Sequence, residues 1–596
     1  MSTPTPTKEQ QMILDSPARI RLIRAVPGSG KTWLVADLIK KELAQWQPMH
    51  SGIAALSFTR VGGDEIRKAV GYDLHHPHFV GTIDAFLFRF IVRPFLKEVL
   101  PELAIPRLIP AEWEPNKWQK GANCTNFTVR VGAGSSAKVF NLFDVCFLGE
   151  DKDEPIIACK QRPWHPIAPL DGQAKAAVLK AKRTIWEKHG WLTHSDAAFL
   201  ASKILGSQSH GPMVRAEVLR RFPLVIIDEL QDTGWFLGQC ILQLLADLSV
   251  RSVLVGDPDQ AIYEFNGARP DLFDRFAEPS GTQELPLGRT QRCSPAVCKV
   301  AKHLAEPNRC IDPAPDRTGR AFLLSYKSLE EDIRQLHVTL ARRSDNGIVK
   351  TVARHTKTVE MLTGCAVEES PKLGSVPLNH LHRAVNSLRR RRQVSALAAA
   401  QAALEYALFG HEGITNDELA GRGIDSTAWR RVTAEVLLEA NSEMTGESFE
   451  SWGKRMAAFI QNHLTSIVST GSGTSKIKLP SGDVKCETRE AYLIAPTSNF
   501  SQERRVVVQT VHAVKGETHD LTVFVCPDTN QANRCPSEIW WADGEERRIA
   551  FVAITRTRGD LIVCVSEQCF ARLKEKRTSF VGSFECMPIG SFIANN

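Results

Sequence analysis

The segment Ala25–Thr32, which reads Ala-Val-Pro-Gly-Ser-Gly-Lys-Thr, constrains the fold of this chain more than any other stretch. An apolar run, Ile20–Ala25, precedes it, and a helix-like stretch, Trp33–Leu43, follows it. This order of strand, glycine-rich turn and helix is typical of a phosphate-binding loop. Small residues at Gly28 and Gly30 let backbone N–H groups close around an anion, and the helix start adds its positive dipole end. The sequence therefore predicts an α/β domain that binds a nucleotide.

The residue types in the loop predict how the ligand is held. We expect Lys31 to reach the β- and γ-phosphates of ATP and the hydroxyl of Thr32 to ligate Mg²⁺. The predicted ATP-binding residues of this segment are Ala25, Val26, Pro27, Gly28, Ser29, Gly30, Lys31, Thr32 and Trp33.

A predicted strand ends in two carboxylates, which could bind the metal ion and orient the attacking water. Residues Phe222–Glu229 form an apolar run that ends in Asp228 and Glu229. Phosphoryl-transfer sites of this kind need a carboxylate for the metal ion and a group that orients the attacking water. We expect Asp228 to bind Mg²⁺, directly or through water, and Glu229 to polarise the water. Together with the loop, the pair predicts an ATP hydrolase.

Apolar runs elsewhere indicate two α/β cores, because strands that alternate with helices favour parallel sheets. The further strand candidates are Gly52–Phe58, Leu224–Ile227, Val253–Val255, Val506–Val511, Leu521–Val525 and Leu561–Val565, and the helix candidates are Gly63–Val70, Ala396–Leu408 and Thr427–Ala440. We predict a first core from residues 1–88 and 213–280, interrupted by 89–212, and a second from 281–372 and 501–596, interrupted by 373–500. Within the second interruption, Ser469–Lys485 reads as a loop or ribbon.

The acidic pair continues as Asp228-Glu-Leu-Gln-Asp-Thr233, and motifs on either side of it follow a familiar order. The set resembles the UvrD/Rep-type superfamily 1 DNA helicases. The motifs that carry this resemblance are Thr7–Gln10, Ala54–Arg60, Val80–Phe86, Val255–Tyr263, Thr290–Ser294, Thr510–Glu517 and Glu545–Arg556. The resemblance implies an α/β fold with two RecA-like parallel-sheet motor domains, each with a mainly α-helical insertion subdomain.

On the ATP side, the resemblance implies that Gln10 reads adenine, Gln260 senses the γ-phosphate and Glu517 lies near the ribose. It also implies that Arg292 and Arg556 are arginine fingers of the second core. The predicted catalytic residues are Lys31, Asp228, Glu229, Gln260, Arg292 and Arg556. Because an arginine finger contributes about 10³–10⁵ in rate, hydrolysis would depend on closure of one core against the other.

On the DNA side, the resemblance implies contacts to single-stranded DNA. The predicted residues are Phe58, Thr59, Thr82, Tyr263, Phe265 and His512. Aromatic rings stack on any base, at about 1–3 kcal/mol each, so we expect little sequence preference. Tyr263 and Phe265 have an alternative interpretation as core residues, and His512 as a buried structural histidine. RNA also remains open as the track, because stacking is indifferent to the 2′-OH.

Some positions depart from the family pattern. Gln291 stands where the family has a tyrosine that stacks on adenine, and Trp33 stands where it has an arginine. We hypothesise that the Trp33 indole replaces the missing stacking surface. Asn266 replaces an arginine that contacts DNA, and the order Gly516-Glu517 shifts the ribose contact. These departures weaken the prediction of adenine selectivity rather than that of hydrolysis.

Two clusters outside the motifs keep two interpretations each. Arg389–Arg392 is a solvated helix face or a contact to duplex phosphates. Trp540 and Trp541 either pack beneath the last motif helix, which we expect, or stack on nucleic acid.

Composition excludes other classes of protein. A net charge of +7 over 596 residues permits a nucleic-acid partner without requiring one. A run of about 18 apolar residues, which a membrane span needs, does not occur, and Met1–Pro6 does not begin a secretory signal. The 14 cysteines include no Cys-x-x-Cys pair, which disfavours zinc and iron–sulfur sites and predicts reduced thiols in a cytoplasmic protein.

The leading functional prediction is an ATP- and Mg²⁺-dependent DNA helicase that moves 3′→5′ on single strands and at junctions with duplex, with polarity implied by the resemblance alone. The alternative is a DNA-sensing regulatory ATPase, because compact members of the family occur beside a nuclease in anti-phage systems such as Gabija. About 40 residues follow Arg556, so we expect any nuclease to be a separate partner. A metabolic P-loop kinase is a third interpretation, which predicts no stimulation by single-stranded DNA.

Overall fold

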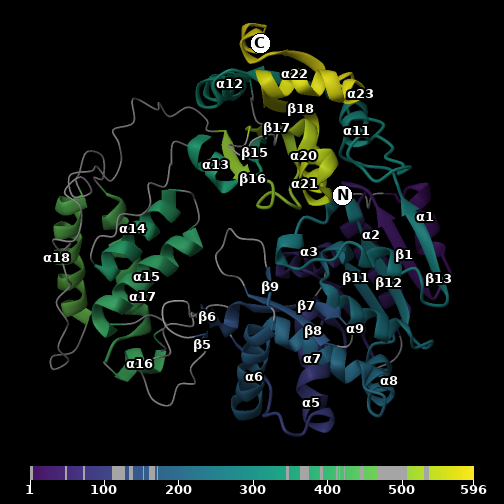
Figure 1. Cartoon of the computed structure of the whole chain (residues 1–596), viewed down its shortest axis with the longest axis vertical. Helices are drawn as coiled ribbons and strands as arrows, with labels where there is room; N and C mark the ends of the chain where they lie inside the picture. The colour runs from purple at the N-terminus through teal and green to yellow at the C-terminus, as the bar shows by residue number, and fades with distance from the viewer. Residues whose placement is uncertain are drawn as a thin grey trace. The chain divides into compact units, whose positions relative to one another are not determined.

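The computed structural model describes residues 5–46, 50–71, 74–109, 128–132, 138–151, 154–159, 168–170, 172–343, 348–362, 375–389, 393–410, 414, 416–421, 423–442, 449–467, 506–528 and 536–595. The chain divides into two compact units. One unit contains both α/β cores and the first interruption, and the other contains the helices between Val376 and Ile467. Figure 1 shows the first sheet in purple and teal and the second in green and yellow.

The first core is built on a six-stranded parallel sheet, in the order β13-β1-β12-β11-β2-β3. Its strands are β1 (Ile20–Ala25), β2 (Ile53–Ser57), β3 (Phe79–Thr82), β11 (Leu224–Asp228), β12 (Arg251–Gly256) and β13 (Thr282–Leu287). The strands expected at β1, β2, β11 and β12 are confirmed. However, β13 pairs with β1, so the predicted end of this core at residue 280 is wrong. The reason is that β13 is an edge strand in which only two of six residues are buried, so the sequence shows no apolar run there.

Side chains of the first sheet alternate between two apolar clusters, one on each face. Leu22 and Leu254 join a cluster with the helices α8 (Gly211–Arg221) and α9 (Trp235–Leu245). Ile23 and Val255 join the opposite cluster, which includes α1 (Lys8–Asp15), α2 (Lys31–Ala44) and α3 (Arg60–Val70). Both faces of the sheet are therefore covered, as expected for a parallel sheet.

The second core repeats this plan with a parallel sheet in the order β16-β15-β17-β18-β14-β19. The strands are β14 (Ala321–Tyr326), β15 (Val349–Ala353), β16 (Val507–Thr510), β17 (His519–Cys526), β18 (Thr557–Ser566) and β19 (Glu585–Pro588). The helices α11 (Pro295–Ala301), α12 (Leu329–Arg343), α21 (Gly544–Ile554) and α22 (Glu567–Lys576) flank it. The expected strands at β16, β17 and β18 and the two-core α/β fold are confirmed.

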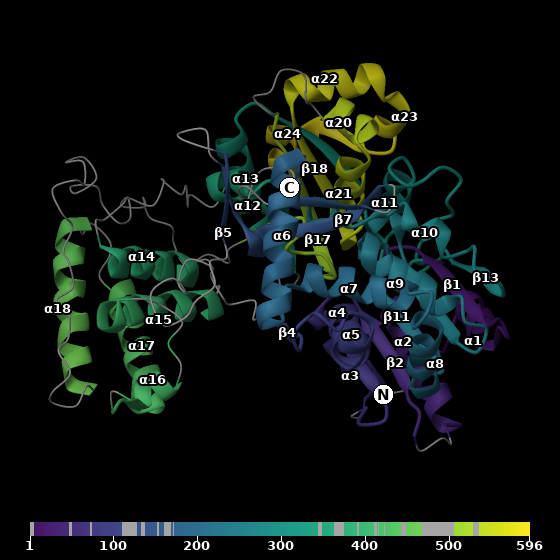
Figure 2. The ribbon, with the colours of Figure 1, turned by 60° about the horizontal axis from the view of Figure 1, so that its bottom comes forward.

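The two interruptions differ in structure. The first contains α5 (Arg93–Val99), α6 (Gly172–His189) and α7 (His194–Gly206), which Figure 2 shows beside the first core. It also contains more strand than predicted, because β7 (Val145–Asp151) and β8 (Glu154–Cys159) form an antiparallel pair with β9 (Ala168–Pro169). These strands bury Phe147 and Ile157, but they are short and irregular, and their alternation is weak in the sequence.

The second interruption is helical in its described part, as predicted. Its helices are α14 (Val376–Arg389), α15 (Gln393–Phe409), α16 (Asn416–Gly421), α17 (Ser426–Asn441) and α18 (Phe449–Ile467). They enclose an apolar cluster of their own that includes Trp429 and Trp452. The predicted loop Ser469–Lys485 and the arginines 390–392 lie outside the described residues.

Three further sequence predictions can be compared with the described residues. Among them, no helix is both long and apolar enough to cross a bilayer. Nine cysteines are free thiols, whereas Cys569 is disulfide-bonded, so the prediction of reduced thiols fails at that residue. Trp540 is buried and stacks on Phe524 at 5.7 Å between ring centroids, and Trp541 meets Phe580 at 5.2 Å. The interpretation of both tryptophans as packing residues is confirmed.

Candidate functional site

The carboxyl ends of three parallel strands bring the predicted catalytic motifs to one edge of the first sheet. β1 ends at Ala25 and leads into the phosphate loop, β11 ends at Asp228, and β12 ends at Gly256, shortly before Gln260. Ligands of parallel α/β sheets bind at this edge. The topology thus explains why motifs far apart in the sequence contribute to one site.

The phosphate loop is held by α1. Thr7 and Gln10 form a capping box at the start of this helix, which fixes the Gln10 side chain. Its amide nitrogen then donates to the carbonyl oxygen of Ser29 at 3.2 Å. Gly30 begins α2 with a φ of +85°, and a Cβ there would lie 3.0 Å from the Gln10 amide nitrogen. Gln10 therefore touches the loop, while its contact to adenine stays a prediction.

The two carboxylates at the end of β11 have opposite protonation tendencies. Burial raises the pKa of Asp228 to about 7, and the neighbouring Glu229 adds to the shift. Burial also acts on Glu229, but the charges of Lys31 and Lys515, together with other donors, hold its pKa below the ordinary value. Glu229 has a φ of 56°, in the left-handed region that non-glycine residues rarely adopt. The site thus keeps one carboxylate ionised in a strained turn.

The residues present fit a magnesium ion. Mg²⁺ prefers oxygen ligands and is held by one or two carboxylates together with substrate phosphates. Asp228 is buried beside a second carboxylate, so a cation would favour its ionised form. Thr32 lies in the first turn of α2, on the same loop as Lys31. Thr32 and Asp228 would hold the ion, and phosphate oxygens would supply further ligands.

Both predicted arginine fingers reach this edge from the second part of the chain. Arg556 is 1 % exposed, and its Nη2 donates to the side-chain oxygen of Gln260 at 2.7 Å. Burial lowers the pKa of Arg556 to about 9, and Arg292 contributes to the shift. Arg292 donates through Nη1 to the Thr555 carbonyl at 3.1 Å. Within the described residues, both guanidinium groups donate hydrogen bonds to neutral oxygens and neither forms an ion pair with a carboxylate.

The segment before the first finger lies directly on the phosphate loop. The backbone N–H of Gln291 donates to the Gly28 carbonyl at 2.7 Å. Gly28 has a φ of +70°, and a Cβ at this position would lie 2.5 Å from the Cβ of Arg292. Any side chain at Gly28 would therefore displace the finger as well as strain the loop.

Electrostatic contacts link the two sides of the site. The charges of Lys31 and Arg556 both lower the pKa of Glu229, which places all three residues in one neighbourhood. The structure thus brings together every predicted catalytic residue: Lys31, Asp228, Glu229, Gln260, Arg292 and Arg556.

Two residues that sequence reasoning missed hold the site together. Lys515 donates to the Asp232 carboxylate at 2.6 Å and to the Gln260 carbonyl at 2.9 Å. Arg309 pairs with Asp257 at 2.6 Å, and also contacts Asp259 and the carbonyl of Ala25. Lys515 lies inside the Thr510–Glu517 motif, which could have suggested it, but Arg309 lies in no motif.

Two predicted nucleotide contacts have partners outside the loop. Glu517 contacts Lys350 and lies 3.2 Å from His519, both in the second core, and its role at the ribose stays a prediction. Trp33 is partly buried against the apolar cluster of α1 and α2. Its proposed stacking on adenine also stays a prediction.

The predicted DNA-binding aromatics form one cluster, which we call the aromatic cluster: Phe58, Tyr263, Phe265 and His512. The rings of Phe58 and Tyr263 stack at 6.1 Å, those of Tyr263 and Phe265 lie 6.0 Å apart, and those of Phe265 and His512 lie 5.3 Å apart. Lys515 places its ammonium 4.6 Å from the centre of the Tyr263 ring. Phe265 is 51 % exposed, so the interpretation of this residue as core is wrong.

The polar members of the predicted DNA set make local hydrogen bonds. His512 Nε2 lies 3.0 Å from the Ile262 carbonyl, so Nε2 carries the proton and donates. Burial lowers the pKa of His512 to about 4, which leaves the ring neutral at pH 7. The hydroxyls of Thr59 and Thr82 accept N–H groups at the starts of their helices, at 3.0 and 3.2 Å. Their own O–H groups remain able to donate to phosphate.

One family model and several known proteins resemble part of this chain. The UvrD/REP helicase N-terminal domain matches residues 6–112 and 164–280. The Gabija protein GajB of Bacillus cereus is 25% identical over 44% of this chain and 41% of that protein. DNA helicase II of Salmonella typhimurium is 22% identical over 50% of this chain and 40% of that protein. The RecBCD enzyme subunit RecB of Mycolicibacterium smegmatis is 30% identical over 24% of this chain and 13% of that protein. The chain thus spans at most about two fifths of these relatives.

Proposed function

We propose that this chain, whose residues 6–112 and 164–280 belong to the UvrD/REP helicase family, is an ATP-driven motor that moves along single-stranded DNA and unwinds duplex ahead of it. The observation that carries the proposal is a continuous set of contacts from the catalytic residues to the aromatic cluster. Arg556 bonds to the side chain of Gln260, and Lys515 bonds to the backbone of Gln260 while lying over Tyr263.

Hydrolysis would use each residue according to its environment. Lys31 would bind the β- and γ-phosphates, and Thr32 and Asp228 would hold Mg²⁺, which would neutralise phosphate charge. The low pKa of Glu229 keeps its carboxylate ionised, so it can accept a hydrogen bond from the attacking water. Arg292 and Arg556 stabilise the charge that develops on the transferred phosphoryl group.

Coupling to DNA would run through the segment Gln260–Tyr263. Side chains of the second core hold its backbone: Arg548 donates to the Ala261 carbonyl at 2.7 Å, and His512 donates to the Ile262 carbonyl at 3.0 Å. A shift of the second core on hydrolysis would therefore move Tyr263 directly. Alternating grip of the two cores on a strand converts this shift into stepping, and we propose 3′→5′ polarity.

Strand displacement tests this function. Duplexes with a 3′ or a 5′ single-stranded tail are mixed with the full chain, ATP and Mg²⁺, and ATP turnover is followed in parallel. The proposal expects ATPase stimulation by single-stranded DNA and unwinding of the duplex with the 3′ tail. Preference for the 5′ tail would overturn the polarity, and ATPase that ignores DNA would overturn the motor.

A second candidate is a DNA-sensing regulatory ATPase that controls a nuclease partner in anti-phage defence. The similarity to the Gabija protein GajB favours it, and the similarity to RecB adds a relative that works within a multi-protein enzyme, RecBCD. The same assay separates the two candidates. Stimulated ATPase without unwinding by the chain alone would favour the regulatory role, and unwinding by the chain alone would refute it.

A further inference from the structure

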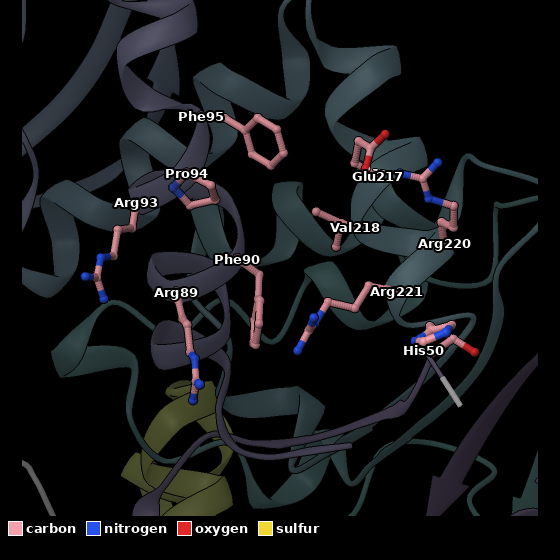
Figure 3. A pocket seen from close by; sticks show the side chains of 11 residues that line it. His50, Arg89, Phe90, Arg93, Pro94, Phe95, Glu217, Val218, Arg220 and Arg221 are labelled. Atoms are coloured by element: carbon pink, nitrogen blue, oxygen red, sulfur yellow. Dashed lines mark hydrogen bonds and ion pairs between the residues drawn. The ribbon is translucent and has the colours of Figure 1, made fainter. Parts of the chain in front are cut away.

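A cavity of about 1010 Å³ lies apart from the catalytic residues, between two helical segments of the first unit. One side is formed by the π-helical turn η1 (Phe88–Val92) and α5, and the other by α8. The residues that matter for its chemistry are Arg89, Phe90, Arg93, Phe95, Arg220 and Arg221. Figure 3 shows Phe90 and Arg221 extending toward each other between the two helical segments.

The cavity lies at the amino edge of the first sheet. His50 and Ser51, which line it, come just before β2, and Arg221 comes just before β11. Asp228, by contrast, ends β11 at the carboxyl edge. A strand of this length spans roughly 16 Å, so a ligand in the cavity would not overlap the triphosphate.

Within the part of the chain that the structure describes, the arginines of the cavity form no ion pair with a carboxylate, with one exception. Arg220 pairs with Glu217. Arg89, Arg93 and Arg221 have no ion pair with any described residue, and the Nε of Arg221 is buried without a hydrogen-bond partner. A buried donor that is not satisfied costs free energy, and like charges gathered in one cavity repel. An anion in the cavity would reduce this repulsion, because Arg89 and Arg93 are exposed to it.

Ring faces hold two of these arginines in place. The guanidinium carbons of Arg89 and Arg221 lie 5.4 and 5.3 Å from the centre of the Phe90 ring. Both distances are within the range of cation–π attraction. A guanidinium whose carbon rests on a ring can still donate N–H groups in bidentate hydrogen bonds, and this planar fork matches phosphate.

We propose that this cavity is a nucleotide-binding site separate from the phosphate loop, for a free nucleotide or for a nucleotide unit of a nucleic-acid strand. Arg89, Arg93 and Arg221 bind the phosphates, and the base stacks against Phe95 or a guanidinium plane, as bases do in single-strand recognition. The volume is far larger than a phosphate ion needs and lies at the upper end of ligand pockets, which are about 300–1,000 Å³. The inference does not depend on the motor function.

Binding stoichiometry tests the proposal. The full chain is saturated with a non-hydrolysable ATP analogue and Mg²⁺, so that the phosphate loop is filled, and is titrated calorimetrically with a thymidine dinucleotide and with an oligothymidylate of about 12 nucleotides. We expect a binding event that the double variant Arg89→Gln/Arg93→Gln weakens by about 10- to 100-fold, since hydrogen bonds to charged groups are lost. Arg220→Gln is the matched control, and it should change little because Glu217 already neutralises that charge.

Each outcome has a defined meaning. If the double variant weakens the dinucleotide and the longer strand equally, the cavity is a free-nucleotide site, and if it weakens only the longer strand, the cavity is a strand contact; both results support the proposal. Unchanged affinities in the double variant overturn it. So does arginine-dependent binding of a glutamate-rich peptide without nucleotide binding.

A parallel measurement guards against a folding defect. Arg89 and Arg93 are exposed, so we expect the double variant to keep the Tm and basal ATPase of the parent chain. If its Tm falls, the pair Arg89→Lys/Arg93→Lys retains charge and loses the bidentate fork, and binding that matches the parent chain in this variant would also overturn phosphate recognition through the guanidinium forks. Loss of motor activity with intact cavity binding would separate failure of the proposed function from failure of this site.

Discussion

Among the described residues, two groups of arginines form no ion pair with a carboxylate, but they are held in different ways. Arg292 and Arg556 bond to the neutral oxygens of Thr555 and Gln260. Arg89 and Arg221 rest on the face of Phe90, close to the start of the first sheet's strands. Arg556 reaches across to Gln260 of the first core, and the segment of Arg292 lies on the phosphate loop through Gln291, so the positions of both depend on both cores. The positions of Arg89 and Arg221 do not depend on the second core, because their ring contact, Phe90, belongs to the first part of the chain. Only the first pair can therefore report closure of the cores, whereas both groups can attract an anion.

The largest expected effect comes from the arginine that depends most on both cores. Arg556→Ala should reduce kcat for ATP by about 10³–10⁵, the contribution of an arginine finger. Nucleotide affinity should fall much less, because Lys31 and the loop backbone remain. Stopped-flow binding of a fluorescent ATP analogue and steady-state ATPase would measure the two effects. Arg558→Ala is the matched control, since Arg558 is exposed and pairs with Asp520. Equal losses of kcat in both variants would contradict the comparison.

The second largest expected effect on kcat comes from Glu229, the carboxylate opposite the arginine fingers. Glu229→Gln should reduce kcat by about 10²–10⁴, the usual contribution of a group that takes part in proton transfer, with ATP still bound. Glu65→Gln removes a nearby carboxylate that influences Asp228 without lying at the strand end, and kcat should stay close to that of the parent chain. Normal turnover in Glu229→Gln would show that the water-orienting residue is elsewhere.

A third arginine, Arg309, differs from both groups because it is paired with two buried carboxylates. Arg309→Ala should lower the free energy of unfolding by about 3–5 kcal/mol, since Asp257 and Asp259 are left buried without their cation. Urea unfolding would measure it. The exposed pair of Arg183 with Glu187 is the comparison, and Arg183→Ala should cost about 0–1 kcal/mol. A small effect at Arg309 would mean that water reaches these carboxylates.

The sequence was informative where a local backbone requirement selects the residue. Gly28 and Gly30 adopt positive φ in the phosphate loop, and Asp228 ends a fully buried strand, so both patterns are visible in a few consecutive residues. Arg309 gave no such signal, because its partners Asp257 and Ala25 are distant in the sequence.

The cavity likewise could not be predicted from the sequence, because it depends on contacts between distant segments. Arg89 and Arg93 belong to no sequence motif, and they line the cavity only because η1 and α5 pack near α8, which no local pattern encodes. The boundary error at β13 has a related cause, since an edge strand needs few apolar residues.

The aromatic cluster allows DNA binding at the predicted track to be compared with DNA binding at the arginine cavity. Phe265→Ala should weaken binding of single-stranded DNA by about 1–3 kcal/mol, the loss of one stacking ring, and should leave ATPase without DNA unchanged. Fluorescence anisotropy with a labelled oligonucleotide would measure it. Phe570→Ala removes a partly buried ring of the second core and serves as the control. If Arg89→Gln/Arg93→Gln weakens the same oligonucleotide as much as Phe265→Ala, the cavity lies on the path of the strand rather than binding a free nucleotide.

The smallest effect concerns the base of ATP rather than its phosphates. Trp33 stands next to Thr32 and is only partly buried, so part of its ring remains able to meet adenine. An aromatic contact contributes about 0.5–1.5 kcal/mol beyond area burial, so Trp33→Ala should weaken ATP binding by roughly 2- to 12-fold. Affinity for inorganic triphosphate should not change, because it has no base to stack. Unchanged ATP affinity would remove the idea that this indole replaces the family's tyrosine, and would leave Gln10 as the residue that reads the base.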